Sequence, residues 1–334
     1  MSAPIAVVTG GAGFIGSHAV DLLLSRGYVV RVIDNLSGGR LRNLEQHARN
    51  PQLEVQVADV RDLKPNSALF ADATYVFHFA GIGDIVPSVE RPVDYVSVNA
   101  MGTVAVLEAA RAARVSKLVY AASSSCYGIT TELPTTEWAS IRPEYPYALS
   151  KWMGEESVLH WGKVYKLPVV SIRIFNAYGP RSRTSGAYGA VFGVFLAQKL
   201  NGRPFTVVGD GTQTRDFVFV RDLAGAFLAA AESPRVQEIY NVGAGRPQSV
   251  NRLVELLGGE AVRVPLRPGE PHCTWADITK IRTELGWEPQ VSFEDGVAEM
   301  LRNIQYWREA PVWDPASIEK ATGAWFEALS GESR

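Results

Sequence analysis

The sequence predicts an α/β fold with a doubly wound parallel sheet, followed by a smaller α/β domain. Two observations lead to this fold class: apolar, β-branched runs recur through the first half of the chain, and an amphipathic helical stretch follows each of them. Such runs are typical of parallel strands that are buried on both faces and joined by crossover helices. The six candidate strands cover residues 5–8, 29–33, 53–57, 75–79, 117–121 and 169–173.

The pattern changes after Pro180, where Gly-rich and Pro-rich stretches separate shorter apolar runs. Helices are predicted near residues 190–200, 221–231 and 250–257. This looser pattern indicates a second, smaller α/β domain.

We expect the two domains to interleave. The first covers residues 1–173 and includes a returning segment of roughly 214–243, and the second covers residues 174–334. The second ends in a helical extension over residues 314–330, which Asp314 and Pro315 open as a capped helix. Its apolar residues share one face at helical spacing, namely Ile318, Ala321, Trp325 and Leu329. We expect this face to pack against the domain or a second subunit rather than to take part in chemistry.

The composition is that of an ordinary globular protein, with 46% hydrophobic and 20% charged residues among 334. With a formal net charge of -2, the chain has no excess of basic side chains to bind the phosphate backbone of a nucleic acid. Nucleic acid is therefore not expected as a partner. We see neither a signal peptide nor an apolar run long enough to span a membrane, and we expect a cytoplasmic location. Cys126 and Cys273 lie far apart, so we expect neither a metal site nor a disulfide framework.

A glycine-rich segment, residues 9–16, separates the first candidate strand from a helix that begins near Phe14. Gly10 permits a tight turn, Gly13 lets the backbone approach a pyrophosphate, and Gly16 lets helix and strand pack closely. The N-terminus of the helix, with Phe14 and Ile15, then faces the anionic phosphates. Taken alone, the glycine pattern is weak evidence for a cofactor site, and a structural turn is the alternative.

The end of the second candidate strand favours the cofactor interpretation. Asp34 lies 18 residues after Gly16, where a carboxylate can accept hydrogen bonds from the hydroxyls of an adenine ribose. A carboxylate also repels a ribose 2′-phosphate, so we predict NAD rather than NADP. Arg40, close by in the sequence, is the one feature that favours NADP.

Polar residues beside the second and third strands extend this site. Asn35 follows Asp34 directly, and Asp59 and Val60 follow the third candidate strand. The Asp59 carboxylate can accept a hydrogen bond from the adenine amino group or cap a helix, and the sequence does not separate these alternatives.

The fourth candidate strand supplies small residues and a nearby asparagine. Phe79, Ala80 and Gly81 end the strand, where small side chains let a ligand pass close to the backbone. Asn99 falls on a predicted helix, and a buried asparagine in a helix normally has a specific hydrogen bond to make. We include all four residues in the predicted cofactor site.

A tyrosine and a lysine are spaced about one helical turn apart in the middle of the chain. Tyr147 and Lys151 lie four residues apart, directly after Pro146, so they project from the same face of a predicted helix. A nearby ammonium favours the phenolate and lowers the pKa of tyrosine, whose usual value of about 10 is too high for a base at neutral pH. Ser123 ends a strand at the sheet edge where ligands bind in open α/β sheets. Tyr147 and Lys151 are therefore a candidate acid–base pair, and Ser123 is a candidate partner at the same edge of the sheet.

These motifs together resemble the extended short-chain dehydrogenase/reductase family of NAD-dependent sugar epimerases and dehydratases. The resemblance runs through nearly the whole chain in the family's order, by way of TGGAGFIG, SSSCYG, YALSK, RIFNAYGP, GDGTQTRDF, NVGAG and RPGEPHCTWAD. It implies a Rossmann fold, bound NAD and a nucleotide-sugar substrate. It also implies that Ser123 hydrogen-bonds the sugar C4 hydroxyl and that Tyr147 removes its proton as hydride leaves C4. Lys151 is expected to bind the nicotinamide ribose.

The two residues after Ser123 bear on the type of reaction. Relatives that eliminate water or carbon dioxide generally carry an acidic residue there, because elimination needs a base at C5 and an acid for the leaving group. This chain has Ser124 and Ser125, so it resembles the 4-epimerases, and both serines are expected near the sugar C6. The nearest alternative is a dehydratase or decarboxylase that recruits a carboxylate from elsewhere. A non-catalytic NAD-sensing protein is a more distant one.

The resemblance also implies where the nucleotide binds. Asn176 is expected on the sugar or the diphosphate, Arg215 and Arg267 on the diphosphate, and Glu270 near the nucleoside ribose. Gln213 belongs to the same motif as Arg215. Guanidinium groups suit phosphate oxygens, although a surface ion pair is the alternative for each arginine.

Three further residues bear on the identity of the substrate. Thr274 matches a gate position where a small residue permits an N-acetylated sugar. Arg181 and Arg183 lie in a segment that departs from the family pattern, and either can meet a carboxylate or an extra phosphate.

By resemblance, residues 93–113 and 147–165 form a four-helix bundle in a homodimer, and C2 dimers are the commonest oligomers.

Overall fold

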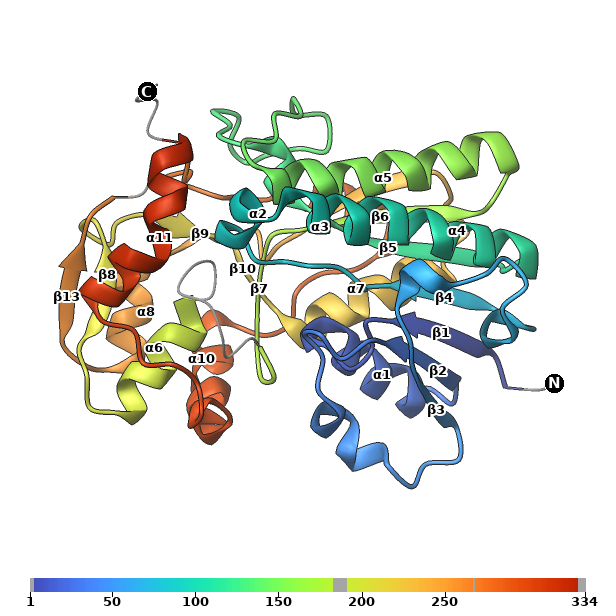
Figure 1. Ribbon diagram of the computed structural model, residues 1–334, viewed down its shortest axis with the longest axis horizontal. Helices are drawn as coiled ribbons and strands as arrows, with labels where there is room; N and C mark the ends of the chain where they lie inside the picture. Colours follow the sequence, from blue (N-terminus) through green and yellow to red (C-terminus); the bar gives the residue numbers. More distant parts are fainter. Residues whose placement is uncertain (1–2, 183–190, 267, 330–334) are drawn as a thin grey trace.

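A seven-stranded sheet, parallel throughout, forms the centre of the protein (Figure 1). The computed structural model describes residues 3–182, 191–266 and 268–329. The strand order is β11-β6-β5-β4-β1-β2-β3. The strands are β1 (Ile5–Thr9), β2 (Val29–Asp34), β3 (Leu53–Val57), β4 (Tyr75–His78), β5 (Lys117–Ser123), β6 (Val169–Ile174) and β11 (Glu238–Val242). The predicted doubly wound Rossmann fold is confirmed.

Helices cover both faces of this sheet (Figure 1). On one face lie α1 (Phe14–Ser25) and α7 (Val220–Glu232), and on the other lie α4 (Gly102–Ala113) and α5 (Pro146–Tyr165). Because both faces are covered, central strands such as β5 and β6 are buried along their whole length. Each fully buried valine or leucine in such a strand contributes about 1.5–3 kcal/mol to folding.

The sequence-based count of six strands was one too low. The seventh strand, β11, pairs with β6 after the chain has left the sheet and returned. It carries Glu238 and Asn241 within its five residues, so its apolar pattern is weak. In the sequence, the helix α7 comes directly before β11, and it packs against α1. Residues 220–242 of the returning segment thus pack on the central sheet, whereas residues 214–219 pair with strands of the second half. The domain boundaries themselves stay predictions.

The second half forms a smaller α/β unit around a cluster of aromatic side chains. Its strands pair in twos: β7 (Asn176–Tyr178) with β10 (Phe217–Phe219), β8 (Phe205–Val208) with β13 (Ala261–Val264), and β9 (Thr214–Arg215) with β12 (Gln248–Ser249). Its helices are α6 (Val191–Leu200), α8 (Val250–Leu257), α10 (Phe293–Arg302) and α11 (Pro315–Leu329), whereas α9 (Thr279–Leu285) packs on β11 of the central sheet. Tyr178 stacks on Phe192 with ring centres 4.7 Å apart, and both contact Phe217 and Phe293.

Three short helical segments lead from β4 to α4. These are α2 (Val86–Glu90), α3 (Pro92–Val96) and a π-helical turn, Ser97–Met101. The C-terminal helix α11 packs on α2 through Trp325 and Val86, both buried (Figure 1). The predicted apolar face of this helix therefore packs against the same chain.

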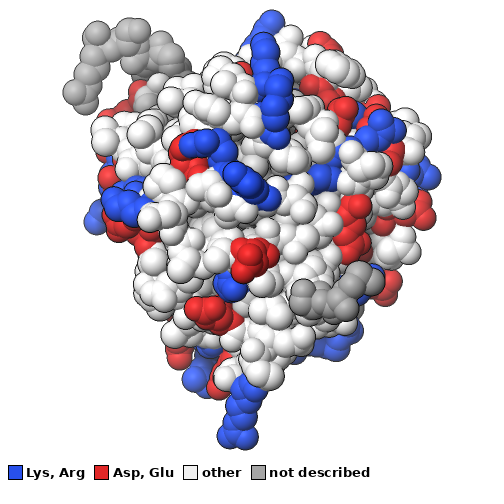
Figure 2. Space-filling view, turned by 90° about the vertical axis from the view of Figure 1, so that its right-hand side faces the viewer, with Lys and Arg blue, Asp and Glu red and all other residues white. Residues whose placement is uncertain are grey.

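The surface carries charges of both signs. On the face that Figure 2 shows, acidic and basic side chains are interspersed among uncharged residues. Among the described residues, no helix has the length and apolar character that a membrane span requires.

A buried ion pair joins α5 to the sheet beneath it. The Glu155 carboxylate accepts hydrogen bonds from Nε of Arg173 at 3.0 and 3.1 Å and from Ser171 Oγ at 2.8 Å. Arg173 also donates to the Tyr127 hydroxyl at 2.9 Å. Glu155 is 1% exposed and Arg173 3%, so each charge depends on the other for compensation.

Removal of one partner should therefore be costly. We expect Glu155→Leu to lower the free energy of unfolding by about 3–5 kcal/mol, because it leaves a buried guanidinium without its counter-charge. Urea denaturation followed by circular dichroism measures this. The double variant Glu155→Leu/Arg173→Leu should recover much of the loss. Equal stability of the single variant and the parent protein would contradict the argument.

Candidate active site

A large cavity lies at the carboxyl ends of the central strands. Its volume is about 1110 Å³, and residues that follow β1, β2, β4, β5 and β6 line it. Ligands in open parallel sheets bind at this edge. Pockets for one small molecule typically measure about 300–1000 Å³, so this cavity has room for a cofactor and a substrate together.

The predicted site residues converge on this cavity. Among those in the described part of the chain, all line it except Gly13 and Asn99. Arg183 and Arg267 lie outside the described residues. The roles assigned to the individual residues stay predictions, but the sequence-based set is brought together in space.

The glycine turn leaves no room for side chains. Gly10 has a φ of +70°, and a Cβ there would lie 2.7 Å from the backbone nitrogen of Ala80. A Cβ on Gly16 would collide with the carbonyl oxygen of Gly10. Gly13 adopts extended backbone at the N-cap of α1, which begins at Phe14 as predicted. The turn is thus built by close packing of β1, β4 and α1, and it brings Gly10, Phe14, Ile15 and Gly16 into the lining of the cavity.

The backbone holds Asp34 at the end of β2. Its carboxylate accepts hydrogen bonds from the backbone nitrogens of Ala12 at 3.0 Å and Leu36 at 2.8 Å. Each oxygen has further lone pairs, and the residue lines the cavity. Burial raises the pKa of Asp34, and the two backbone hydrogen bonds act in the opposite direction. The arrangement fits a carboxylate that accepts two ribose hydroxyls.

Asp59 acts as a helix cap. Its carboxylate accepts hydrogen bonds from the Arg61 backbone nitrogen at 2.9 Å and the Asn35 amide at 2.9 Å, and it pairs with the Arg61 guanidinium at 2.8 Å. The hydrogen bonds from Arg61 hold the pKa of this carboxyl well below its usual range. Of the two sequence-based alternatives, the structure shows the cap. Asn35, Asp59 and Val60 nevertheless line the cavity, so their contact with a cofactor stays a prediction.

Asn99 positions the loop after β4. Its Oδ1 accepts a hydrogen bond from the Ile82 nitrogen at 2.8 Å, and its Nδ2 donates to the Ile82 oxygen and to Ser150 Oγ, both at 3.0 Å. The predicted specific hydrogen bonds of this buried asparagine are present, and they tie α5 to the loop. A Cβ on Gly81 would lie 2.9 Å from Asn99 Oδ1 and 3.7 Å from Lys151 Nζ. The absence of a side chain at Gly81 therefore leaves room for the Asn99 amide.

The three predicted catalytic residues lie together. Tyr147 Oη and Ser123 Oγ are 3.4 Å apart, and Lys151, one turn beyond Tyr147 on α5, lines the same cavity. Pro146 occupies the first turn of α5, where its missing N–H costs nothing, so Tyr147 is held at a rigid helix start. Ser123 Oγ also accepts a hydrogen bond from the Ser125 nitrogen at 3.2 Å and contacts Ser125 Oγ at 3.0 Å.

Lys151 is buried and titrates near neutrality. Burial lowers its pKa to about 7, while the charge of Glu155, the next turn of α5, raises it. Its ammonium lies 4.5 Å from the centre of the Tyr120 ring. A cation in so dry a place acts strongly on a neighbouring phenol, because water screens it little.

The substrate half of the cavity is already organised by hydrogen bonds. Thr274 Oγ1 donates to Asn176 Oδ1 at 2.7 Å, and it accepts a hydrogen bond from the Asp216 nitrogen at 3.1 Å. Arg215 pairs with Glu270 at 2.7 Å, so both predicted nucleotide ligands are held in one orientation. The Gln213 amide donates to the Val208 oxygen at 3.0 Å. Ser124 and Ser125 line the cavity beside Ser123, as the resemblance implied.

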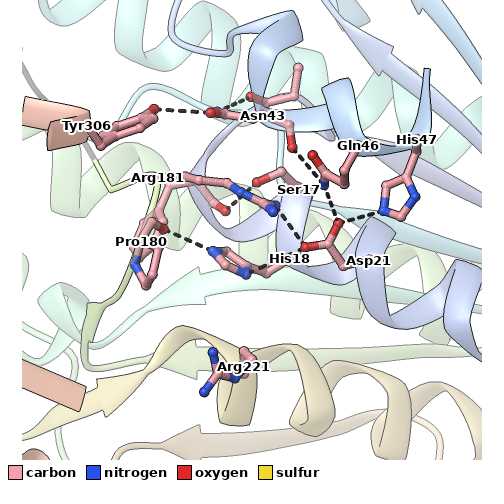
Figure 3. A network of polar contacts seen from close by, with 12 residues as sticks. Ser17, His18, Asp21, Asn43, Gln46, His47, Pro180, Arg181, Arg221 and Tyr306 are labelled. Carbon is pink, nitrogen blue, oxygen red and sulfur yellow. Dashed lines mark hydrogen bonds and ion pairs between the residues drawn. The ribbon is translucent and has the colours of Figure 1, made fainter. Parts of the chain in front are cut away.

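Arg181 has a different partner from the predicted ones. Its guanidinium pairs with Asp21 of α1 at 2.9 Å, and the adjacent Pro180 oxygen lies 2.9 Å from His18 Nε2 (Figure 3). Figure 3 shows these contacts tying the segment after β7 to α1. The sequence analysis did not predict this ion pair. Arg181 still lines the cavity, and its contact with substrate stays a prediction.

Sequence reasoning missed Tyr145 in the lining of the cavity, and it placed Asp216 in the GDGTQTRDF motif without assigning it a role. Tyr145 lines the cavity next to Tyr147, and no sequence signal separates it from any aromatic residue before a helix. Asp216 is fully buried, and its carboxylate accepts hydrogen bonds from the nitrogens of Ala244, Gly245 and Ala276 at 2.7–3.1 Å. It thereby joins three loops beneath the substrate half. Its position in the GDGTQTRDF motif was the available signal.

The family assignment follows from comparison with known proteins. The model of the NAD-dependent epimerase/dehydratase family matches residues 6–243. The chain belongs to this family. The resemblance inferred from the motifs is therefore confirmed, and this epimerase/dehydratase family member has NAD as its cofactor, which the cradle of Gly10, Asp34 and Gly81 fits.

Individual relatives differ in their reactions. The UDP-glucose 4-epimerase of Mycolicibacterium smegmatis is 37% identical over 309 residues, covering 89% of this chain and 98% of the relative. UDP-glucuronic acid decarboxylase 2 of Arabidopsis thaliana is 33% identical over 309 residues, covering 90% of this chain and 68% of the relative. Among solved structures, UDP-glucuronic acid 4-epimerase from Bacillus cereus, in complex with UDP-glucuronic acid and NAD, superposes with a TM-score of 0.83 at 32% identity, covering 90% of this chain and 99% of that chain.

The titration of Lys151 leads to a prediction about stability. Its pKa is about 7 in the folded chain and roughly 10 in an unfolded one, so the unfolded state binds more protons between these values. The destabilisation by the lysine is complete below about pH 7 and disappears as the pH rises toward about 10. We expect Lys151→Met to raise the Tm at pH 7, by an amount that shrinks toward pH 10. Calorimetry across this range measures it, with the exposed Lys163→Met on the same helix as control. A Tm difference independent of pH would refute the burial argument.

Proposed function

We propose that this protein is an NAD-dependent 4-epimerase of a UDP-sugar of the glucose, N-acetylglucosamine or glucuronate type. One observation carries the proposal: Ser123 and Tyr147 lie 3.4 Å apart at the carboxyl end of β5, and the two positions after Ser123 are serines. The named activities of the relatives in Mycolicibacterium smegmatis and Bacillus cereus support it.

The proposed reaction requires a base that removes the proton of the sugar C4 hydroxyl. In the proposed reaction Ser123 orients the sugar C4 hydroxyl, and Tyr147 takes its proton onto the phenolate oxygen. Bound NAD supplies the acceptor for hydride from C4 and the donor that returns it. Lys151 favours the phenolate, and Tyr147 later returns the proton to the oxygen at C4 once the keto sugar has presented its other face. No second substrate is consumed, so the enzyme is an isomerase.

The serine pair distinguishes this reaction from elimination. A dehydratase or decarboxylase needs an acid–base group at C5 or C6 in addition to the tyrosine. The hydrogen-bond partners of Ser123 Oγ are the Ser125 nitrogen and the hydroxyls of Ser125 and Tyr147. Glu144 and Asp84 line the same cavity, and the relative in Arabidopsis thaliana is a decarboxylase, so elimination is the rival outcome of the test.

The opposite half of the cavity is proposed to bind the nucleoside diphosphate. Arg215 and Glu270, held together at 2.7 Å, suit a diphosphate oxygen and a ribose hydroxyl respectively. Asn176 is proposed to contact the sugar or the diphosphate. Thr274, whose hydroxyl is fixed between Asn176 and Asp216, keeps the wall small beside the sugar and leaves room for an N-acetyl group.

The reaction type and Tyr147 can be tested together. Purified protein is incubated with a panel of UDP-sugars without added reductant, and products are followed by anion-exchange chromatography and proton NMR. We expect interconversion of two C4 epimers at constant mass. Tyr147→Phe should lower the turnover by roughly 10²–10⁴-fold, because the phenol is the general base.

Tyr165→Phe, an exposed tyrosine on the same helix, serves as the matched control and should keep the parent rate. Loss of water or carbon dioxide from the sugar would reject the epimerase. In that case Glu144→Gln and Asp84→Asn would identify the acid–base group.

We also propose that the protein is a homodimer and is located in the cytoplasm. Helices α4 and α5 lie side by side over the sheet (Figure 1). The predicted dimer helices carry exposed apolar side chains, among them Val93 (78% exposed), Met101 (62%) and Met153 (37%). Burial of such a surface is what a stable interface requires.

Both cysteines are free, which suits a reducing compartment.

A charge in the proposed interface should separate the subunits. We expect Met153→Glu to shift the protein from dimer to monomer, because a carboxylate would be buried without a partner. Size-exclusion chromatography with light scattering measures the mass. Val236→Glu, which alters an exposed apolar residue before β11, is the control and should leave the dimer intact. A dimeric Met153→Glu protein would place the interface elsewhere.

A further inference from the structure

A tyrosine of the second half reaches the cofactor end of the large cavity. Tyr306, in the 3₁₀ helix Ile304–Trp307, donates a hydrogen bond from its phenol to Oδ1 of Asn43 at 3.1 Å (Figure 3). Asn43 lies in another 3₁₀ helix, Leu41–His47, which follows β2. Both residues line the large cavity, as does Asp34. This contact therefore joins the two halves of the chain beside the NAD site.

Asn43 holds a peptide unit of the glycine turn. It is 3% exposed, and its Nδ2 donates to the carbonyl oxygen of Ala12 at 2.8 Å. That oxygen belongs to the peptide unit whose nitrogen is Gly13, and this nitrogen donates to the Gly10 oxygen at 3.1 Å. The nitrogen of Ala12, in the preceding peptide unit, donates to the Asp34 carboxylate at 3.0 Å. Hydrogen bonds thus fix both peptide units that meet at Ala12.

The hydrogen bonds run in one direction from the phenol to the turn. Tyr306 donates to the side-chain amide of Asn43, and this amide donates to the peptide unit that in turn donates to Gly10. Aligned hydrogen bonds of this kind polarise and strengthen one another. Among the described residues, Oδ1 of Asn43 has no other donor. Loss of the phenol hydroxyl therefore leaves a buried amide oxygen unsatisfied, which is costly.

The Tyr306 ring is held by residues of both halves. The guanidinium carbon of Arg42 lies 4.4 Å from the ring centre, and that of Arg40 lies 6.0 Å from it. Trp307, which is fully buried in the aromatic cluster of the second half, contacts the ring edge-on with centres 5.2 Å apart. The backbone nitrogen of Arg40 also donates to the Ala12 oxygen at 2.9 Å. A phenylalanine at this position would keep the ring contacts and lose only the hydroxyl.

Tyr306 also belongs to the wall between two cavities. The large cavity and a neighbouring one of about 430 Å³ share three lining residues, Asn43, Arg181 and Tyr306. Asp21 of α1 supports this wall, because its carboxylate accepts a hydrogen bond from Gln46 at 2.7 Å and pairs with Arg181 at 2.9 Å (Figure 3). The wall is thus built from both halves of the chain.

We propose that Tyr306 is a positioning residue of the NAD site, which holds the glycine turn through Asn43 and keeps bound NAD from leaving. NAD is then released when this contact between the two halves opens. Every cofactor contact predicted from the sequence lies in the first half, so Tyr306 gives the second half a part in cofactor binding. This role concerns NAD itself and is independent of the sugar and of the reaction at C4.

The test is Tyr306→Phe in the holoenzyme. Released NAD is trapped by an excess of alcohol dehydrogenase and ethanol, which reduce it to NADH, and the absorbance of NADH gives the rate of release. We expect release to be about 3–10-fold faster than from the parent protein, because loss of one hydrogen bond favours the open state by about this factor.

Tyr240→Phe is the matched control. The phenol of Tyr240 belongs to a fully buried residue and donates to Glu284 at 2.8 Å, but Tyr240 is not among the residues that line the large cavity. Both variants lose one hydrogen bond, so urea denaturation should show a similar loss of stability. Only Tyr306→Phe should release NAD faster, since a merely structural role would lower stability without a change in release.

A second variant tests the path through Asn43. Asn43→Leu removes the amide and keeps a side chain of similar volume, so the phenol loses the group on which it acts. Release of NAD should be faster from Asn43→Leu than from the parent protein, and Tyr306→Phe should add little to this in the double variant.

Release of NAD from Tyr306→Phe at the parent rate overturns the role of Tyr306. An equal acceleration in Tyr240→Phe overturns it too, as does full additivity of Tyr306→Phe with Asn43→Leu. The rate of release is measured without sugar turnover. A parent protein that epimerises no UDP-sugar would therefore reject the proposed function, while NAD release would still decide the role of Tyr306.

Discussion

The common direction of the sheet strands is the constraint on which the rest of the structure depends. Because every strand of the central sheet is parallel and both faces are covered by helices, polar residues that follow the strands emerge at one edge. Gly10, Asp34, Gly81 and Ser123 follow or end four different strands, yet they line one cavity. The second domain closes this edge, since β7 leads out of the sheet directly after β6.

Burial gives the polar groups of the cavity their chemical properties. Lys151 has a lowered pKa because it is taken out of water, and its charge acts on a neighbouring phenol with little screening. Glu155, one turn along the same helix and paired with Arg173 of β6, raises the pKa of the lysine in opposition to burial. The helix that carries the catalytic pair is therefore tied to the sheet by charge as well as by packing. A rigid start at Pro146 then fixes where Tyr147 points.

Much of the fold and of the cofactor site could be predicted because their signals are local. Strand and helix periodicity predicted the Rossmann sheet within a residue or two at most strand ends, and the glycine turn with Asp34 predicted where a dinucleotide binds. The prediction missed β11, since its pairing with β6 joins segments far apart in the sequence and its own pattern is weak. For Asp59 the sequence left two alternatives open, and only the geometry of Arg61 and Asn35 shows a cap.

The sequence by itself determined the fold class, the family and the chemical types present: a glycine turn, a carboxylate after β2, and a serine, a tyrosine and a lysine in motif order. Only the tertiary structure decided which partners those groups have. Arg181 pairs with Asp21 of α1, Asn99 holds the loop after β4, and the ring of Tyr145 contacts Trp325 of the C-terminal helix. The reason is physical: periodicity and motif spacing act over a few residues, whereas the partner of a buried polar group is set by whichever distant segment packs against it.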